Sequence, residues 1–172
     1  MTGGGNQVSS AEDEHRFADF HEQYVSKYIQ LADAKAGTVI VAVSVVIGYL
    51  FGSKETMAVL HAPGMGWSFG VAFLSILLLT GSAGCAALVV WPRTGGVPHN
   101  LIFWERVAAM ERQDFLDAVG QAGSADLARE RLKHCHAIAA TCTRKYRWLR
   151  ASFVLGGIAL VLSGVGRFLA GA

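Results

Sequence analysis

The chain has 172 residues, of which 52% are hydrophobic and only 16% are charged. The charged residues avoid three long apolar stretches, and soluble domains of this size rarely separate charge so cleanly. A net charge of +2 with no block of Lys and Arg argues against a nucleic-acid-binding protein, so the composition indicates a small integral membrane protein.

Residues 1–35 are predicted to form an amphipathic helix that runs unbroken into the first apolar stretch. From residue 17 onward, large apolar side chains recur every three or four positions, which is the spacing of one helix face. The segment is rich in acidic residues and shows neither a short basic leader nor a small-residue cleavage pattern, so we do not expect a cleavable signal peptide. The recurring apolar positions are Phe20, Tyr24, Tyr28 and Leu31.

Residues 36–52, 67–91 and 151–169 are predicted to cross a membrane as helices. A bilayer core of about 30 Å needs roughly 20 helical residues. The second stretch exceeds that length, and the first and third reach it with their flanking residues. Residues 53–66 then form a short outer loop. Because no charged side chain lies in the apolar core of any stretch, we do not expect a transporter built on a charged residue at mid-bilayer.

Two glycine pairs, Gly48 with Gly52 and Gly66 with Gly70, have the four-residue spacing of small side chains at contacts between membrane helices. The general abundance of glycine in membrane helices explains the spacing equally well. Both explanations stay open at this point.

Residues 92–150 are predicted to be a helical region outside the membrane. Asn100 is a suitable N-cap for a helix over residues 101–119, which glycines end, and Ser124 is suited to cap the next helix. In that helix, apolar residues repeat with strict 4-3 spacing toward the third apolar stretch, as in a packing seam. They are Ala128, Leu132, Cys135, Ala139, Cys142, Tyr146 and Leu149.

Positive residues indicate the orientation, because Lys and Arg near a span are retained on the cytoplasmic side. Residues 1–35 hold three, the outer loop holds one and residues 92–150 hold ten. We therefore expect the N-terminus and residues 92–150 in the cytoplasm. The expected fold is an all-α membrane protein with three transmembrane helices, in which the first and third continue as long helices into a cytoplasmic helical bundle.

No motif for catalysis or metal binding is present. The sequence lacks a P-loop, a GxSxG elbow and an HExxH pattern, so we expect no enzyme and no cofactor. His134 and His136 flank Cys135, but two positions along a helix differ by about 200°, so the imidazoles point in opposite directions and no metal site is expected. The three cysteines are expected to be buried as small apolar side chains.

Charged residues cluster instead where the first and third apolar stretches begin. Arg and Lys at such a junction suit an anionic ligand such as a phosphate. Anchoring to lipid headgroups explains the same residues and is the more common role for any one of them. The candidate ligand-binding residues are Asp33, Lys35, Asn100, His136, Arg144, Lys145 and Arg147.

At these residues the chain resembles the small transmembrane effectors of Pycsar anti-phage systems. The resemblance is carried by Tyr28-Ile-Gln-Leu-Ala-Asp-Ala-Lys-Ala at the first apolar stretch, Asn100-Leu-Ile-Phe after the second, and Lys145-Tyr-Arg-Trp-Leu-Arg before the third. The resemblance extends over nearly the whole chain.

The resemblance implies an effector in the bacterial inner membrane that senses a cyclic pyrimidine nucleotide, cyclic CMP or cyclic UMP. Sensing would impair membrane integrity and lead to abortive infection, and a protein this small would need to form a homo-oligomer to perturb a bilayer. The alternatives are a constitutive homo-oligomeric membrane scaffold without a ligand and, with less support, a membrane-bound enzyme. The sequence does not distinguish a pore from bilayer disruption.

Overall fold

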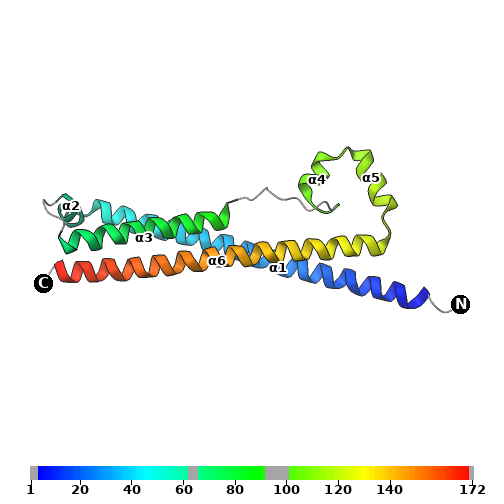
Figure 1. Ribbon diagram of the computed structural model, residues 1–172, viewed down its shortest axis with the longest axis horizontal. Coiled ribbons are helices and arrows are strands. Elements are labelled where there is room, and N and C mark those ends of the chain that lie inside the picture. The colour runs from blue at the N-terminus through cyan, green and yellow to red at the C-terminus, as the bar shows by residue number, and fades with distance from the viewer. Residues whose placement is uncertain (1–3, 62–65, 92–100, 171–172) are drawn as a thin grey trace. The chain divides into compact units, whose positions relative to one another are not determined.

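The computed structural model describes residues 4–61, 66–91 and 101–170, and in these residues all regular structure is helical (Figure 1). Two helices are much longer than the others, and one of intermediate length lies between them in the chain. The helices are α1 (Gly4–Gly52), α2 (Lys54–His61), α3 (Trp67–Val90), α4 (Trp104–Ala109), α5 (Arg112–Gln121) and α6 (Ser124–Ala170).

Three of these helices, α1, α3 and α6, are long and apolar enough to span a membrane. The prediction of an all-α membrane protein is therefore confirmed, as is the prediction that the first and third spans belong to long continuous helices. The chain divides into two compact units, one of residues 1–30 with 92–143 and one of residues 31–91 with 144–172. Each unit contains one part of α1 and one part of α6.

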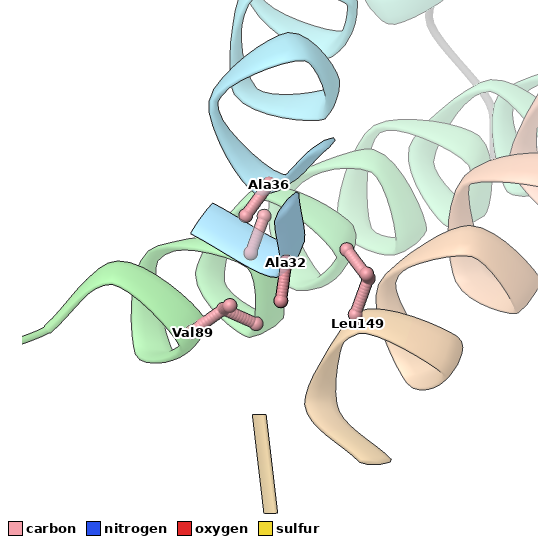
Figure 2. Close-up of a cluster of buried hydrophobic side chains, with 5 residues drawn as sticks. Ala32, Ala36, Val89 and Leu149 are labelled. Atoms are coloured by element: carbon pink, nitrogen blue, oxygen red, sulfur yellow. The ribbon is translucent and has the colours of Figure 1, made fainter. Parts of the chain in front are cut away.

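The second unit packs α1, α3 and α6 around small apolar side chains. One buried cluster joins Ala32 and Ala36 of α1 to Val89 of α3 and Leu149 of α6 (Figure 2), together with Ala86. A second cluster joins α1, α3 and α6 further along the same helices, and consists of Val43, Leu50, Leu79 and Ala159. Alanine at the contact lets helix backbones approach closely, which is how membrane helices gain packing energy where lipid removes the hydrophobic driving force.

Helices α3 and α6 are also joined by hydrogen bonds between two buried serines. The hydroxyl of Ser82 donates to the backbone oxygen of Ser152 at 2.7 Å, and the hydroxyl of Ser152 donates to the backbone oxygen of Ser82 at 2.8 Å. Gly156 makes this approach possible, since a Cβ there would lie 3.0 Å from the Ser82 hydroxyl oxygen. Gly166 has the same role opposite Val71, where a Cβ would lie 3.0 Å from a methyl group.

The glycine pairs that the sequence singles out do not make such contacts within the described parts of the chain. A Cβ at Gly48, Gly52 or Gly70 would meet nothing within 4 Å there, and one at Gly66 would meet only the nearby Ser68. The explanation that these glycine pairs form helix–helix contacts is therefore wrong for contacts within one chain, among the described residues. Close approach occurs instead where a glycine faces α3 from α6.

The first unit pairs α1 with α6 along the predicted seam. Ala128 and Cys135 of α6 are buried, and the Cys135 thiol lies 3.6 Å from the backbone oxygen of Ala18 of α1. The seam is confirmed along α6, because its remaining positions in both units are buried or half-buried. In residues 13–30 of α1, however, the buried positions are Ala18 and Val25, and the large aromatic side chains predicted for the apolar face are exposed.

The segment between α3 and α6 differs from the prediction of one helix over residues 101–119. Residues 101–103 are not helical, and the helix is interrupted at Met110 and Glu111, whose backbone is extended. No glycine or proline marks this interruption in the sequence. Asn100, the predicted N-cap, lies outside the described residues. The expected outer loop contains the short helix α2, where the Ser53 hydroxyl accepts a hydrogen bond from the Thr56 amide at 3.2 Å.

Candidate functional site

The candidate site is centred on an ion pair between α1 and α6 in the second unit. The Lys145 ammonium lies 2.5 Å from a carboxylate oxygen of Asp33. The Lys145 side chain is 18% exposed and that of Asp33 is 37% exposed, so the pair is shielded on one side and open to solvent on the other. Two of the predicted site residues, which are 112 positions apart in the sequence, are thus brought into contact.

The packing beneath the pair explains why the two side chains meet. Ala32, which precedes Asp33, is completely buried in the cluster of Figure 2, and Leu149, one turn after Lys145, belongs to the same cluster. Because α1 contributes the small side chains of Ala32 and Ala36 to this cluster, the α6 backbone lies close enough for the lysine to reach the carboxylate. The ion pair therefore lies where α1, α3 and α6 come together.

Three further cationic side chains lie near this pair in the sequence. Lys35 lies two residues after Asp33, and Arg144 and Arg147 lie on either side of Lys145. All three are exposed. Asp33 compensates the charge of Lys145, so these three residues carry an excess of positive charge in the second unit. Exposed guanidinium and ammonium groups of this kind bind phosphate, whether in a free ligand or in a lipid headgroup.

The described part of the second unit does not include two of the predicted site residues. Asn100 lies outside the described residues. His136 is exposed on the part of α6 that belongs to the first unit, whereas Asp33 and Lys145 belong to the second. Among the predicted site residues, the described contacts join Asp33 to Lys145. Lys35, Arg144 and Arg147 are exposed side chains of the same unit.

A second set of cross-helix ion pairs, in the first unit, was not found from the sequence. The Arg131 guanidinium of α6 contacts the carboxylates of Asp19 and Glu22, which lie one turn apart on α1. Arg131 and Asp19 are 112 positions apart, the same separation as Lys145 and Asp33. A comparison of the two helices at one constant offset would have revealed both pairs, because each places a basic residue of α6 opposite an acidic residue of α1.

The histidines and cysteines do not form a metal centre in the described parts of the chain. No group of three or more His, Cys, Asp and Glu side chains there lies close enough to hold a metal ion. Cys135 is buried, and Cys85 and Cys142 are half-buried. The candidate site presents lysine, arginine and one carboxylate, which are groups suited to ionic recognition.

Comparison with known proteins gives an independent result. The family model described as the Pycsar effector protein domain matches residues 17–170. The Pycsar effector protein SaPycTM of Staphylococcus aureus is 24% identical over 143 residues, which cover 83% of this chain and 87% of that protein. No solved structure matches the chain.

Proposed function

The chain belongs to the Pycsar effector family, and on that premise we propose that it detects a cyclic pyrimidine nucleotide, cyclic CMP or cyclic UMP, and then impairs the membrane. Membership gives the general role of a membrane effector in anti-phage defence. The proposal adds the signal and the outcome, which is loss of membrane integrity and abortive infection. It is supported by three helices able to span a membrane. It is also supported by the Asp33–Lys145 ion pair, which lies close to residues 31 and 144, where the parts of α1 and α6 in the second unit begin.

The proposed location is the bacterial inner membrane, with residues 1–35 and 92–150 in the cytoplasm. The distribution of Lys and Arg supports this orientation, since residues 92–150 hold ten and the loop at residues 53–66 holds one. The spans are then residues 36–52, 67–91 and 151–169. In this orientation the Asp33–Lys145 pair lies on the cytoplasmic side, where a nucleotide made in the cell has access to it.

The proposed binding step is an exchange of partners at Lys145. A cyclic nucleotide carries one phosphate charge, which Lys35, Arg144 and Arg147 would attract. A phosphate oxygen would then compete with the Asp33 carboxylate for the Lys145 ammonium, now 2.5 Å away. The ligand favours the state in which Lys145 has left Asp33, because only a difference in affinity between two states can shift their equilibrium. Residues Asn100 and His136 remain proposed additions to this site.

The proposed outcome requires more than one copy of the chain. Three helices enclose no aqueous path of their own, so a homo-oligomer is needed to form a pore or to disturb the bilayer. No catalytic step is part of the proposal. The observation that supports the proposed site is the pairing of Asp33 with Lys145. An anionic ligand that took Lys145 from Asp33 would change a contact between α1 and α6.

Dye release from liposomes containing the purified protein tests the proposal. Cyclic CMP, cyclic UMP, cyclic AMP and cyclic GMP are added one at a time. Release with one cyclic pyrimidine nucleotide alone is the expected result. Absence of release with all four, from protein shown to be correctly inserted, would contradict the proposal and favour the constitutive scaffold.

A pair of arginine variants tests the site in the same assay. Arg147→Gln should raise the nucleotide concentration needed for half-maximal release by about tenfold, since one charge-assisted contact to phosphate contributes roughly 1.5 kcal/mol or more. Arg129→Gln is the matched control, because Arg129 is also an exposed arginine on α6 but lies in the first unit. Equal effects of the two substitutions would show that general surface charge, and not the candidate site, determines the response.

A further inference from the structure

Four aromatic side chains lie exposed in a row on the part of α1 that belongs to the first unit. We name Phe17, Phe20, Tyr24 and Tyr28 the aromatic stripe. Phe20 is 66% exposed and Tyr24 is 50% exposed. Their rings follow one another along the helix, with centroids 6.0 Å apart for Phe20 and Tyr24 and 4.8 Å apart for Tyr24 and Tyr28. The buried positions of the described α1–α6 seam in this unit include Ala18 and Val25 of α1, whereas all four aromatic side chains of the stripe are exposed.

We propose that the aromatic stripe is the contact surface for a second copy of this chain, in a parallel arrangement of two α1 helices. This inference rests on the proposal that copies assemble, but not on which nucleotide is bound. A row of large apolar side chains on one helix fits another helix of the same kind. Two copies inserted in the same direction hold their stripes at the same height above the membrane, so the two rows meet without a shift in register.

The charges beside the stripe are complementary for such a pair. Glu14 and Arg16 are both exposed and are two positions apart, so they lie on opposite sides of the stripe, each about 80° from its centre at 3.6 residues per turn. In a parallel pair related by a two-fold axis, the left side of one helix faces the right side of the other. Arg16 of each copy therefore faces Glu14 of its neighbour. Lys27 lies on the same side as Arg16, so it faces the Glu14 side of the second copy and not its Lys27.

The size of the stripe fits a partner that shares the membrane. Half-exposed aromatic side chains offer about 100 Å² each for burial, so two stripes bury roughly 800 Å². That is below the minimum of about 1,200 Å² for interfaces that are stable between freely diffusing proteins. Anchoring in one bilayer raises the effective concentration of the two copies, and a contact of this size then suffices.

Cysteine crosslinking in native membranes tests the inference. The three native cysteines are first replaced by alanine, and full-length Tyr24→Cys and Gln23→Cys variants are then oxidised in membranes. Adjacent residues differ by about 100° around a helix, so Gln23, which is also exposed, is a matched control at the same height. We expect a disulfide-linked dimer with Tyr24→Cys at a yield at least about fivefold higher than with Gln23→Cys, because a disulfide needs Cα atoms within about 7 Å.

A charge exchange gives a second measurement, in which the cysteine stays at position 24. Arg16→Glu should lower the dimer yield of the Tyr24→Cys variant by severalfold, and adding Glu14→Arg should restore it. A helical circular dichroism spectrum like that of the parent chain shows that each variant is folded. Equal crosslinking at positions 23 and 24, or no restoration by the double exchange, would overturn the inference.

Two further outcomes separate this inference from its alternatives. If the Tyr24→Cys variant neither crosslinks nor reacts with a water-soluble maleimide in inside-out vesicles, lipid covers the stripe and the inference is wrong. If the Tyr24→Cys variant crosslinks but no nucleotide releases dye from liposomes containing the parent chain, the contact surface stands and the proposed function fails.

Discussion

Individual residues determine the contact between α1 and α6 at the candidate site. Lys145 is only 18% exposed, so removal of its partner leaves a partly buried ammonium without a counter-ion. We expect Asp33→Ala to lower the free energy of unfolding by about 1 kcal/mol, a modest value because solvent screens the exposed side of the pair. The Asp33→Ala/Lys145→Ala double variant should be no less stable than Asp33→Ala alone. Thermal unfolding in detergent micelles measures this cycle, and strictly additive losses would show that the two residues do not interact.

Two adjacent glycines of α6 allow a direct test of close packing. A Cβ at Gly156 would lie 3.0 Å from the Ser82 hydroxyl, which is fixed by its hydrogen bond to Ser152, whereas a Cβ at Gly157 would meet nothing within 4 Å among the described residues. Gly156→Val should therefore destabilise the chain by about 2 kcal/mol through overpacking. Gly157→Val should change stability by no more than about 0.5 kcal/mol. A similar loss for both, measured by thermal unfolding, would indicate a general effect of valine on the helix.

At the scale of elements, Arg131 fixes how the parts of α1 and α6 that belong to the first unit pair. Reversing its charge in Arg131→Glu places a third carboxylate beside those of Asp19 and Glu22. We expect faster backbone hydrogen exchange in residues 13–30, corresponding to a loss of about 1 kcal/mol for these partly exposed groups. Substituting Lys for both Asp19 and Glu22 in the same variant should restore protection. Unchanged exchange in Arg131→Glu would show that apolar packing alone holds α1 and α6 together.

The helices α1, α3 and α6 were predictable from the sequence because their signals are local. Long apolar runs and 4-3 spacing identify a helix and its buried face from neighbouring residues alone, as the seam of Ala128, Cys135 and Leu149 shows. The interruption at Met110 and Glu111 had no such signal, since neither glycine nor proline occurs there.

The buried face of α1 was harder to predict because its largest apolar side chains are exposed and its smaller ones are buried. Hydrophobic periodicity gives most weight to Phe20 and Tyr24, but the close approach of α6 requires the small side chains of Ala18, Val25 and Ala32. The candidate site shows the same limit. Sequence proximity identified Lys35, Arg144 and Arg147, whereas the pairing of Lys145 with Asp33 depends on how two distant segments pack.

For the whole molecule, ligand binding should appear as a change in stability even without a membrane. A ligand that binds only the folded state stabilises it by about 2.7 kcal/mol at a concentration of about 100 times its dissociation constant. For a chain of this length, that corresponds to a rise in melting temperature of roughly 5–10 °C. We expect this rise with either cyclic CMP or cyclic UMP and not with cyclic AMP or cyclic GMP. A rise of equal size with all four would mean that the site recognises phosphate without reading the base.

The serine hydrogen bonds between α3 and α6 determine which contact between helices of the second unit separates most easily. Both serines belong to helices long and apolar enough to span a membrane, and in hydrocarbon no water replaces a broken hydrogen bond. Two polar contacts of α1 with α6 in the second unit join Lys145 to Asp33 and Arg167 to Tyr49, where water can replace either partner. A force that opens this unit should therefore move α1 first, while α3 and α6 travel together as one rigid body. The gap that opens would run along the small side chains of α1, such as Ala32 and Ala36. It would be narrow, and the surfaces that line it would carry almost no charge.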